Sequence, residues 1–175
     1  MMRFLLVCAA LALLPSAGMA QTVVPGAGPV HDAGGRNAEM DSFFKTLQRP
    51  ASPNHWLAAP ADYAIRPDAV APVFAVPAAA LHAAFKTLVR QTKGAAIGTE
   101  TVDGLHVVFT SAVFGFKDDV RVQIIALSPQ QSTLALYSAS RVGYWDLGAN
   151  RRRIEDWLAR LQNTLSAATF STSKP

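Results

Sequence analysis

The chain has 175 residues, 50% of them hydrophobic, a formal net charge of +4 at pH 7 and a single cysteine, Cys8. A chain of this length can build one hydrophobic core as a single domain. The charge is only mildly basic and is not clustered as in a nucleic-acid binder, so we expect no nucleic-acid partner.

Residues 1–20 have the pattern of a secretory signal peptide. Arg3 supplies the positive charge, an apolar stretch follows, and Gly18 and Ala20 are the small residues before the expected cleavage after Ala20. The apolar stretch is shorter than the ~20 residues that a membrane-spanning helix needs. Cys8 lies inside this stretch, without the small preceding residue of a lipoprotein anchor. We therefore expect a periplasmic or secreted protein that has no cysteine and no membrane span after cleavage.

Residues 21–48 are predicted to be a Gly/Pro-rich tether, because glycines and prolines are concentrated between residues 23 and 35. Its last part, residues 41–48, is either a short helix capped by Asp41 or more of the tether. Residues 49–63 contain three prolines, which exclude a regular helix, and we expect this segment to lie extended on the domain surface. The domain is predicted to span residues 49–167, followed by a disordered tail at 168–175.

Within this domain, residues 72–76 are predicted to be an edge strand, and Pro77 to open a helix that ends near Gly94. Strands are predicted at residues 95–102, 105–114, 120–127 and 133–141, with Asp103-Gly104 as the turn of the first hairpin. Asn150 is expected to cap the last helix. Its apolar residues recur at the spacing of a helix that covers a sheet, and they are Ile154, Trp157, Leu158, Leu161 and Leu165.

This order predicts an α+β fold, in which an antiparallel sheet of four to five strands carries two helices on one face, in the order β-α-β-β-β-β-α. We place the turn between the last two strands at residues 128–132. The register that keeps the apolar residues on one face then pairs Ile124 with Leu136 and Asp119 with Arg141. The turn at residues 115–118, the loop at 143–148 and the start of the last helix should therefore meet at one end of the sheet.

That end is rich in charge, and two interpretations of it remain open. In the first, it is a structural charge cluster of Asp118, Asp119, Asp146 and Arg141, which offsets the unfavourable arginines at a helix N-terminus. In the second, it is an anion-binding site, with helix amides, glycine-loop amides and arginine side chains around a phosphate or carboxylate. The residues of that site would be Arg141, Gly143, Asn150, Arg151 and Arg153. Arg152 is expected to point to solvent above Asp156.

Three segments resemble an uncharacterised family, the domain of unknown function 1499. They are RPASPNHWLAAP (residues 49–60), TSAVFGFKDDV (110–120) and SRVGYWDLGANRRRIEDWLARL (140–161), so the resemblance covers about residues 49–165. The family pattern carries onto Ser52, Pro53, Asn54, Phe116, Asp118, Asp119, Ser140, Arg141, Gly143, Asp146, Gly148, Asn150, Arg151 and Arg153. The chain departs from that pattern at Ala139 and Trp145. The resemblance implies no known activity.

Metal and triad chemistry are not expected from the sequence, which leaves two classes of function. No pair of histidines has the spacing of metal ligands, so we expect neither metal nor cofactor. A Ser111, His106 and Asp118 triad is excluded, because His106 and Ser111 have opposite strand parity. The first class is a non-enzymatic, monomeric envelope module that binds a small anion or an envelope partner, through the arginine-rich end or an apolar pocket between helices and sheet. The alternative is an enzyme that uses Asp118 or Asp119 as acid or base, which would require an unpaired carboxylate with a raised pKa.

Overall fold

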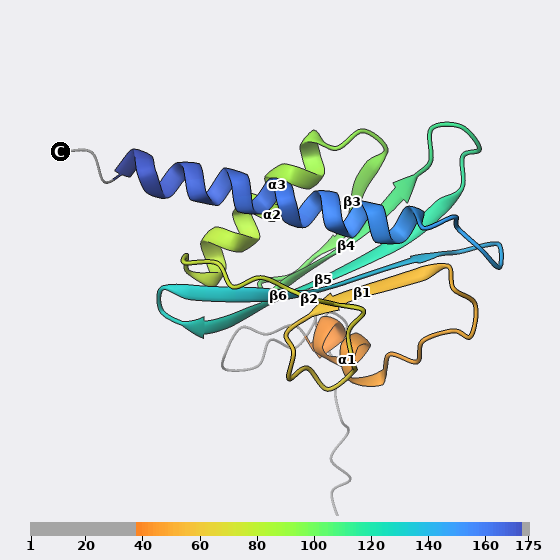
Figure 1. Ribbon diagram of the computed structural model, residues 1–175, viewed down its shortest axis with the longest axis horizontal. Helices are drawn as coiled ribbons and strands as arrows, with labels where there is room; N and C mark the ends of the chain where they lie inside the picture. Colours follow the sequence, from red (N-terminus) through yellow and green to blue (C-terminus); the bar gives the residue numbers. More distant parts are fainter. Residues whose placement is uncertain (1–37, 173–175) are drawn as a thin grey trace, which may run out of the picture.

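The computed structural model describes residues 38–172, which form a six-stranded sheet and three helices (Figure 1). The strand order is β2-β1-β6-β5-β4-β3, with β1 and β2 parallel and all other neighbours antiparallel. The α+β class is as predicted, but the sheet is mixed and larger, and there is a third helix. The elements are α1 (Ala38–Thr46), β1 (His55–Ala59), β2 (Ala69–Val70), α2 (Ala78–Gln91), β3 (Ala95–Glu100), β4 (Gly104–Thr110), β5 (Lys117–Ser128), β6 (Gln131–Ser140) and α3 (Ala149–Thr172).

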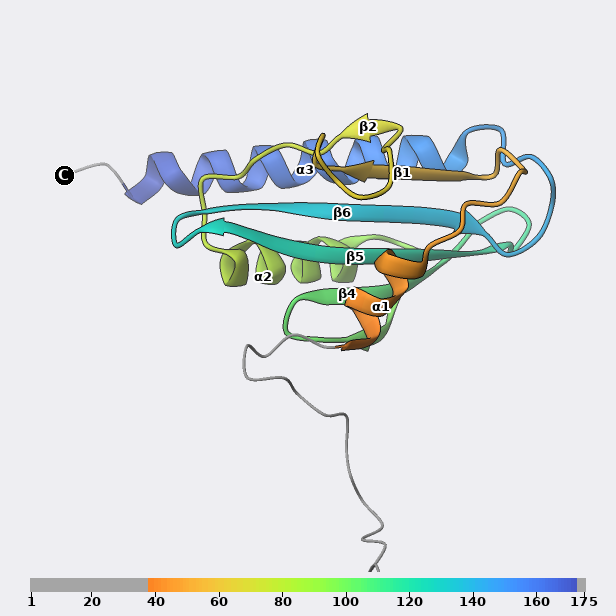
Figure 2. The same cartoon turned by 90° about the horizontal axis from the view of Figure 1, so that it is seen from below.

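The sheet is covered on both faces, whereas the sequence predicted helices on one face only. Helices α2 and α3 pack on one face, and α1 lies on the other (Figures 1 and 2). Met40 and Phe44 of α1 belong to a second apolar cluster, which also includes Leu57 and Tyr137 of the sheet. Successive residues of a strand point to opposite faces, so strands β1 and β6, which both have neighbours on either side, carry buried side chains on both faces.

Helix α1 lies inside the segment predicted to be a tether, so the packed structure begins before residue 49. The short helix considered for residues 41–48 is therefore present, shifted toward the N-terminus. At the other end, α3 extends to Thr172 through the start of the predicted disordered tail. The predicted signal peptide, tether residues 21–37 and residues 173–175 lie outside the described residues.

Two segments before α2 differ from the prediction. Residues 55–59 are not a surface segment but strand β1, paired with β2 and β6, and Leu57 to Ala59 are buried. Residues 72–76 form no strand and make only an isolated bridge between Phe74 and Ser132. Pro72 has no backbone N–H, which limits the hydrogen bonds that this segment can donate to β6.

The register of β5 and β6 also differs from the prediction. Ile124 pairs with Leu134 rather than Leu136, and Asp119 pairs with Ala139 rather than Arg141. The turn is tighter than predicted, since Ser128 already pairs with Gln131 across it. The shift is two residues, so every side chain keeps its predicted face and the same residues still meet at the end of the sheet.

The first predicted hairpin, between β3 and β4, is present, but Gly104 is needed for a reason other than its turn. Gly104 is the first residue of β4, and an added Cβ would lie 2.4 Å from the Val122 carbonyl oxygen and 2.8 Å from Met40 Cγ. A side chain here would collide with both β5 and α1.

Candidate functional site

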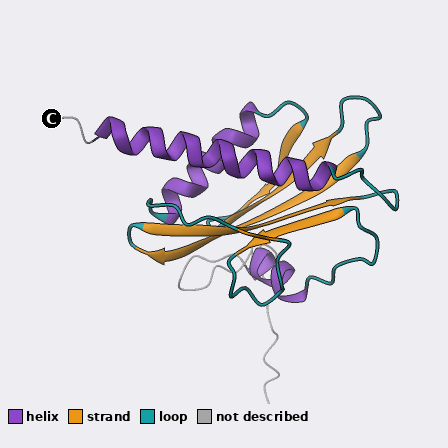
Figure 3. Cartoon of the chain, in the orientation of Figure 1, coloured by secondary structure: helices purple, strands orange, loops and turns teal. Residues whose placement is uncertain are grey.

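Two loops and the start of α3 meet at one end of the sheet, as the sequence predicted (Figure 3). Residues 111–116 connect β4 to β5, and residues 141–148 connect β6 to α3. Tight backbone conformations shape both loops. Gly115 and Gly143 have φ values of 67° and 90°, and Leu147 is the one non-glycine among residues 38–172 with a positive φ, at 55°.

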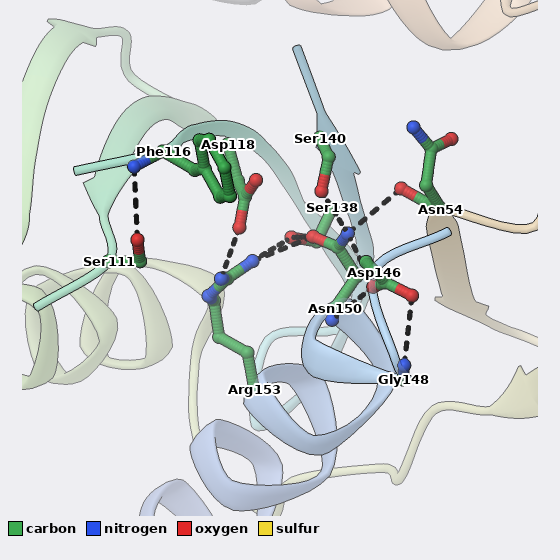
Figure 4. Close-up of polar contacts among 10 residues, drawn as sticks. All are labelled: Asn54, Ser111, Phe116, Asp118, Ser138, Ser140, Asp146, Gly148, Asn150 and Arg153. Atoms are coloured by element: carbon green, nitrogen blue, oxygen red, sulfur yellow. Dashed lines mark hydrogen bonds and ion pairs between the residues drawn. The ribbon is translucent and has the colours of Figure 1, made fainter. Parts of the chain in front are cut away.

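Asn150 is the centre of a buried hydrogen-bond network beneath these loops (Figure 4). Its Oδ1 accepts hydrogen bonds from Ser138 Oγ at 2.5 Å and from Arg153 Nη1 at 2.7 Å. Its Nδ2, whose two hydrogens are shared among three acceptors, lies 2.8–3.0 Å from the Asn54 carbonyl oxygen, Ser140 Oγ and Asp146 Oδ2. One fully buried side chain thus joins β1, β6 and α3, so Asn150 is fully engaged within the protein.

Arg153 is buried beside it and forms an ion pair with Asp118 (Figure 4). Arg153 Nη2 lies 2.5 Å from Asp118 Oδ2, and both side chains are only 7% exposed. Nη1 donates to Ser138 Oγ, and the guanidinium lies 4.1 Å from the ring centroid of Phe109. Burial lowers the pKa of Arg153, while the charge of Asp118 and its hydrogen bond oppose that shift.

Asp146 caps the start of α3, a role that the sequence prediction gave to Asn150. Its Oδ1 accepts the amide of Gly148 at 2.9 Å, and its Oδ2 accepts the amide of Asn150 at 2.7 Å. Burial raises the pKa of Asp146, but these amides and the Asn150 side chain lower it below its ordinary value. The amide of Ala149 donates to the Asp146 carbonyl oxygen, so all three amides at this helix start are used internally.

Asp119 and Arg141 form an ion pair although they are not opposite each other in the sheet. Arg141 Nε and Nη2 each lie 2.8 Å from a carboxylate oxygen of Asp119, and His106 Nε2 lies 2.7 Å from Oδ1. The hydrogen bond from Arg141 is the largest influence on this carboxyl. It outweighs burial and, with His106, lowers the pKa of Asp119 to about 2.

The other two arginines are both exposed, as expected for Arg152, but each has a partner that the sequence did not predict. Arg151 pairs with Glu155 at 2.7 Å and lies over the Trp56 ring, 5.2 Å from its centroid. Arg152, expected to lie above Asp156, instead donates from Nη1 to the Leu147 carbonyl oxygen at 2.8 Å. Among residues 38–172 it has no ion pair, unlike Arg141, Arg151 and Arg153.

A cleft of about 660 Å³ lies between the two loops, over the buried Arg153–Asp118 pair. Arg152 lines it, and its walls are largely apolar. The large hydrophobic side chains that line it are Phe109, Val113, Phe114, Phe116, Val142, Trp145 and Leu147. Phe114 and Phe116 stack with their ring centroids 5.5 Å apart.

The structure therefore brings most of the predicted site residues to one end but gives them different tasks. Gly143 and Arg153 line the cleft, Asn150 lies in the network beneath it, and Arg141 and Arg151 lie outside its lining. Of the predicted charge cluster, Asp118 and Asp119 have arginine partners, whereas Asp146 is a helix cap.

The apolar cleft was not predicted from the sequence. The expected apolar pocket lay between helices and sheet, whereas this cleft lies at the end of the sheet. Two loop segments could have indicated the cleft, because they contain apolar residues where loops usually contain polar ones. These segments are Val113 to Phe116 and Tyr144-Trp145. His106, a partner of Asp119, was also missed.

Over residues 38–172, no three His, Cys, Asp or Glu side chains are grouped so that they could hold a metal ion. In the same range, no helix has the length and apolar character required to cross a membrane.

Comparison with known proteins places the chain in a family. No curated protein matches it. The family described as "Protein of unknown function (DUF1499)" matches residues 46–161, which include both loops, the network around Asn150 and the cleft. That match covers more than half of the 175 residues, so the chain belongs to the DUF1499 family of proteins of unknown function.

Proposed function

We propose that this protein is a non-enzymatic binding module of the cell envelope, and that its ligand is a small amphiphile with an apolar body and one anionic group. The observation that carries the proposal is an apolar-walled cleft lined by one arginine, Arg152, that has no ion pair within residues 38–172. The signal-peptide pattern of residues 1–20 supports a place outside the cytoplasm.

The size and lining of the cleft fit a small organic molecule. Ligand pockets typically measure about 300–1,000 Å³ and combine apolar walls with a few polar groups. The apolar walls favour a hydrocarbon or ring system, since burying them against a ligand removes apolar surface from water. A purely polar anion would leave Phe114, Phe116 and Trp145 uncovered.

Arg152 is the residue that we assign to the anionic group. Arg153 is closer to the cleft floor, but its two terminal nitrogens already donate to Asp118, Ser138 and Asn150. Within residues 38–172 the Arg152 side chain makes one hydrogen bond, from Nη1, so its other side-chain N–H groups remain for a carboxylate or phosphate.

The three carboxylates near the cleft give no support to the enzymatic alternative. Asp118 is paired with Arg153, and Asp146 accepts backbone and side-chain donors. The pKa values of Asp119 and Asp146 are lowered, whereas a general acid or base at neutral pH works best with a pKa near 7.

A titration with matched amphiphiles tests the proposal. Octanoate, octanol and acetate, all below any micelle concentration, would be titrated by calorimetry at constant ionic strength. We expect octanoate to bind most tightly, because octanol lacks the charge and acetate lacks the chain. A ligand that binds the native state also raises the melting temperature.

Arg152→Ala should weaken octanoate binding at least about tenfold, in line with the ~1.5–3 kcal/mol of a hydrogen bond to a charged group. Arg151→Ala is the matched control, because Arg151 is the adjacent residue but is paired with Glu155. Equal losses in the two variants, or no binding of octanoate, would refute the proposal.

A further inference from the structure

Both loops of the site end in apolar side chains that face solvent. The exposed fraction is 81% for Val113, 73% for Phe114 and 73% for Tyr144. Val113 and Phe114 lie in the loop between β4 and β5, and Tyr144 lies in the loop between β6 and α3. Soluble proteins rarely expose large apolar side chains in a group, so this end is a candidate interaction surface.

A small ligand in the cleft does not explain this exposure. Tyr144 is not among the residues that line the cleft, although it is as exposed as Phe114. A molecule seated between the loops would contact their inner sides and leave Tyr144 in water. Covering the tips of both loops at once requires a larger, flatter partner.

The charges around the tips indicate what that partner is. Residues 111–117 contain no acid, and residues 141–152 contain only Asp146, whose carboxylate oxygens are turned to the amides of the helix start. Four exposed cations lie in or next to the two loops. Arg141 and Arg151 are paired with Asp119 and Glu155, whereas Lys117 and Arg152 have no ion pair within residues 38–172 and give this end an excess of positive charge. Apolar side chains, a tyrosine and a tryptophan framed by cations are the composition that binds the interface of an anionic membrane.

We propose that the tips of residues 111–116 and 141–148 dock onto a lipid bilayer that contains anionic lipids. In this arrangement Val113, Phe114, Tyr144 and Trp145 enter the headgroup region, and the surrounding cations contact lipid phosphates. The proposed contact is made by loops, and no helix among residues 38–172 has the length and apolar character to cross a membrane. The inference goes beyond the proposed ligand. Val113, Phe114 and Trp145 also line the cleft, but Tyr144 does not, and the joint exposure of all four is what a small ligand leaves unexplained.

Co-sedimentation with vesicles of phosphatidylcholine and increasing phosphatidylglycerol tests the proposal on the protein isolated from the envelope fraction. We expect binding that increases with the phosphatidylglycerol fraction and weakens with salt. The tip variant Phe114→Ser/Tyr144→Ser should bind at least about tenfold more weakly, given the transfer free energies of aromatic side chains. Lys117→Gln should weaken binding about fivefold, the effect of one cation near an anionic surface.

The matched control is Val102→Ser/Leu127→Ser, which removes two side chains that are 59% and 51% exposed at the other end of the sheet. It carries the same N-terminus as the tip variant, so any contribution of that segment cancels in the comparison. Trp145 is 66% exposed, whereas Trp157 is buried and Trp56 is half-buried beneath Arg151, so a blue shift of fluorescence on vesicles should disappear in Trp145→Phe. Melting temperatures would establish that all variants fold.

Absence of vesicle binding, equal losses in tip and control variants, or indifference to phosphatidylglycerol would overturn the inference. So would a stable dimer that the tip variant converts to a monomer, because a second copy would then cover the loops. Tyr144→Ser should leave octanoate binding unchanged, since Tyr144 is outside the cleft. Vesicle binding without octanoate binding would therefore refute only the proposed ligand, and the reverse would refute only the membrane contact.

Discussion

Replacing Arg153 tests whether the buried ion pair beneath the cleft holds the end of the sheet together. Arg153→Met keeps an apolar stem against the Phe109 ring but removes every donor to Asp118, Ser138 and Asn150. Asp118 is then left 7% exposed and without its cationic partner. A buried charge that loses its partner retains its desolvation penalty and gains nothing in return.

The expected loss in the free energy of unfolding is ~3–5 kcal/mol, the range for breaking a buried pair from one side. For a domain of this size, that corresponds to a fall in melting temperature of roughly 6–20 °C. Arg152→Met is the matched control, because Arg152 is the neighbouring arginine and has no ion pair within residues 38–172. Its loss should stay within ~0.5 kcal/mol, as for most surface substitutions.

Urea unfolding at pH 7 measures these differences, and a double-mutant cycle with Asp118→Asn isolates the interaction. The double variant removes both charges, so it should be at least ~2 kcal/mol more stable than the sum of the single losses implies. Additive single effects would refute the reasoning. So would equal losses for Arg153→Met and Arg152→Met, because burial of the pair would then not matter.

Three further predictions concern other parts of the chain. Arg141 lowers the pKa of Asp119 to about 2 in the folded protein, so the stability that Asp119 contributes should be present above about pH 4 and lost as the pH falls toward about 2. Asp119→Asn should lack this pH dependence. Identical profiles of unfolding free energy against acidic pH for the two proteins, measured with denaturant, would contradict the prediction. Gly94 and Gly143 have similar φ values of 85° and 90°, but only at Gly94 would an added Cβ collide with a backbone oxygen, at 2.5 Å. Gly143→Ala should therefore lower the free energy of unfolding by ~1–2 kcal/mol, and Gly94→Ala should lower it by clearly more. Equal melting temperatures for the two variants would be inconsistent with this packing. The exported protein should start at Gln21, which intact-mass measurement on the envelope fraction would contradict by finding a product that retains Cys8.

Periodic segments were predictable from the sequence because their burial is one-sided and repeats along the chain. Leu81, Phe85 and Leu88 of α2 are buried as their spacing indicated, and so are Ile154 and Trp157 of α3. The four strands from β3 to β6 likewise fall within a few residues of the predicted ranges.

The parts of the fold that were not predicted from the sequence depend on contacts between segments that are distant in the sequence. Strand β1 has five residues and follows a proline-rich stretch, so it is a strand only because it pairs with β6 and β2. Helix α1 covers the second face of the sheet, which is apolar because Leu57 of β1 lies beside Tyr137 of β6. Recognising α1 as part of the domain therefore required the position of β1 first.

The candidate site was only half predictable for a related reason. The gathering of charged residues at the end of the sheet was predictable, because a two-residue error in the register of β5 and β6 leaves every side chain on the same face and close to the same end. The assignment of each arginine to a partner did not follow, because Arg151, Arg152 and Arg153 are consecutive and differ only in the direction that α3 gives them. The apolar cleft lies in loops, where no periodicity reveals which side chains converge.

The end of the sheet that carries the two loops combines a buried hydrogen-bond network with exposed apolar side chains, and the network fixes the elements from which those side chains project. A loop that orders only when it binds pays conformational entropy from the binding free energy. Here Asn150, Asp146 and the Arg153–Asp118 pair fix the start of α3 and the ends of β5 and β6, to which both loops are attached. The loops are thus held close together before any partner arrives. Loss of the network should therefore weaken binding at the loops as well as stability, even where the substituted residue touches no ligand.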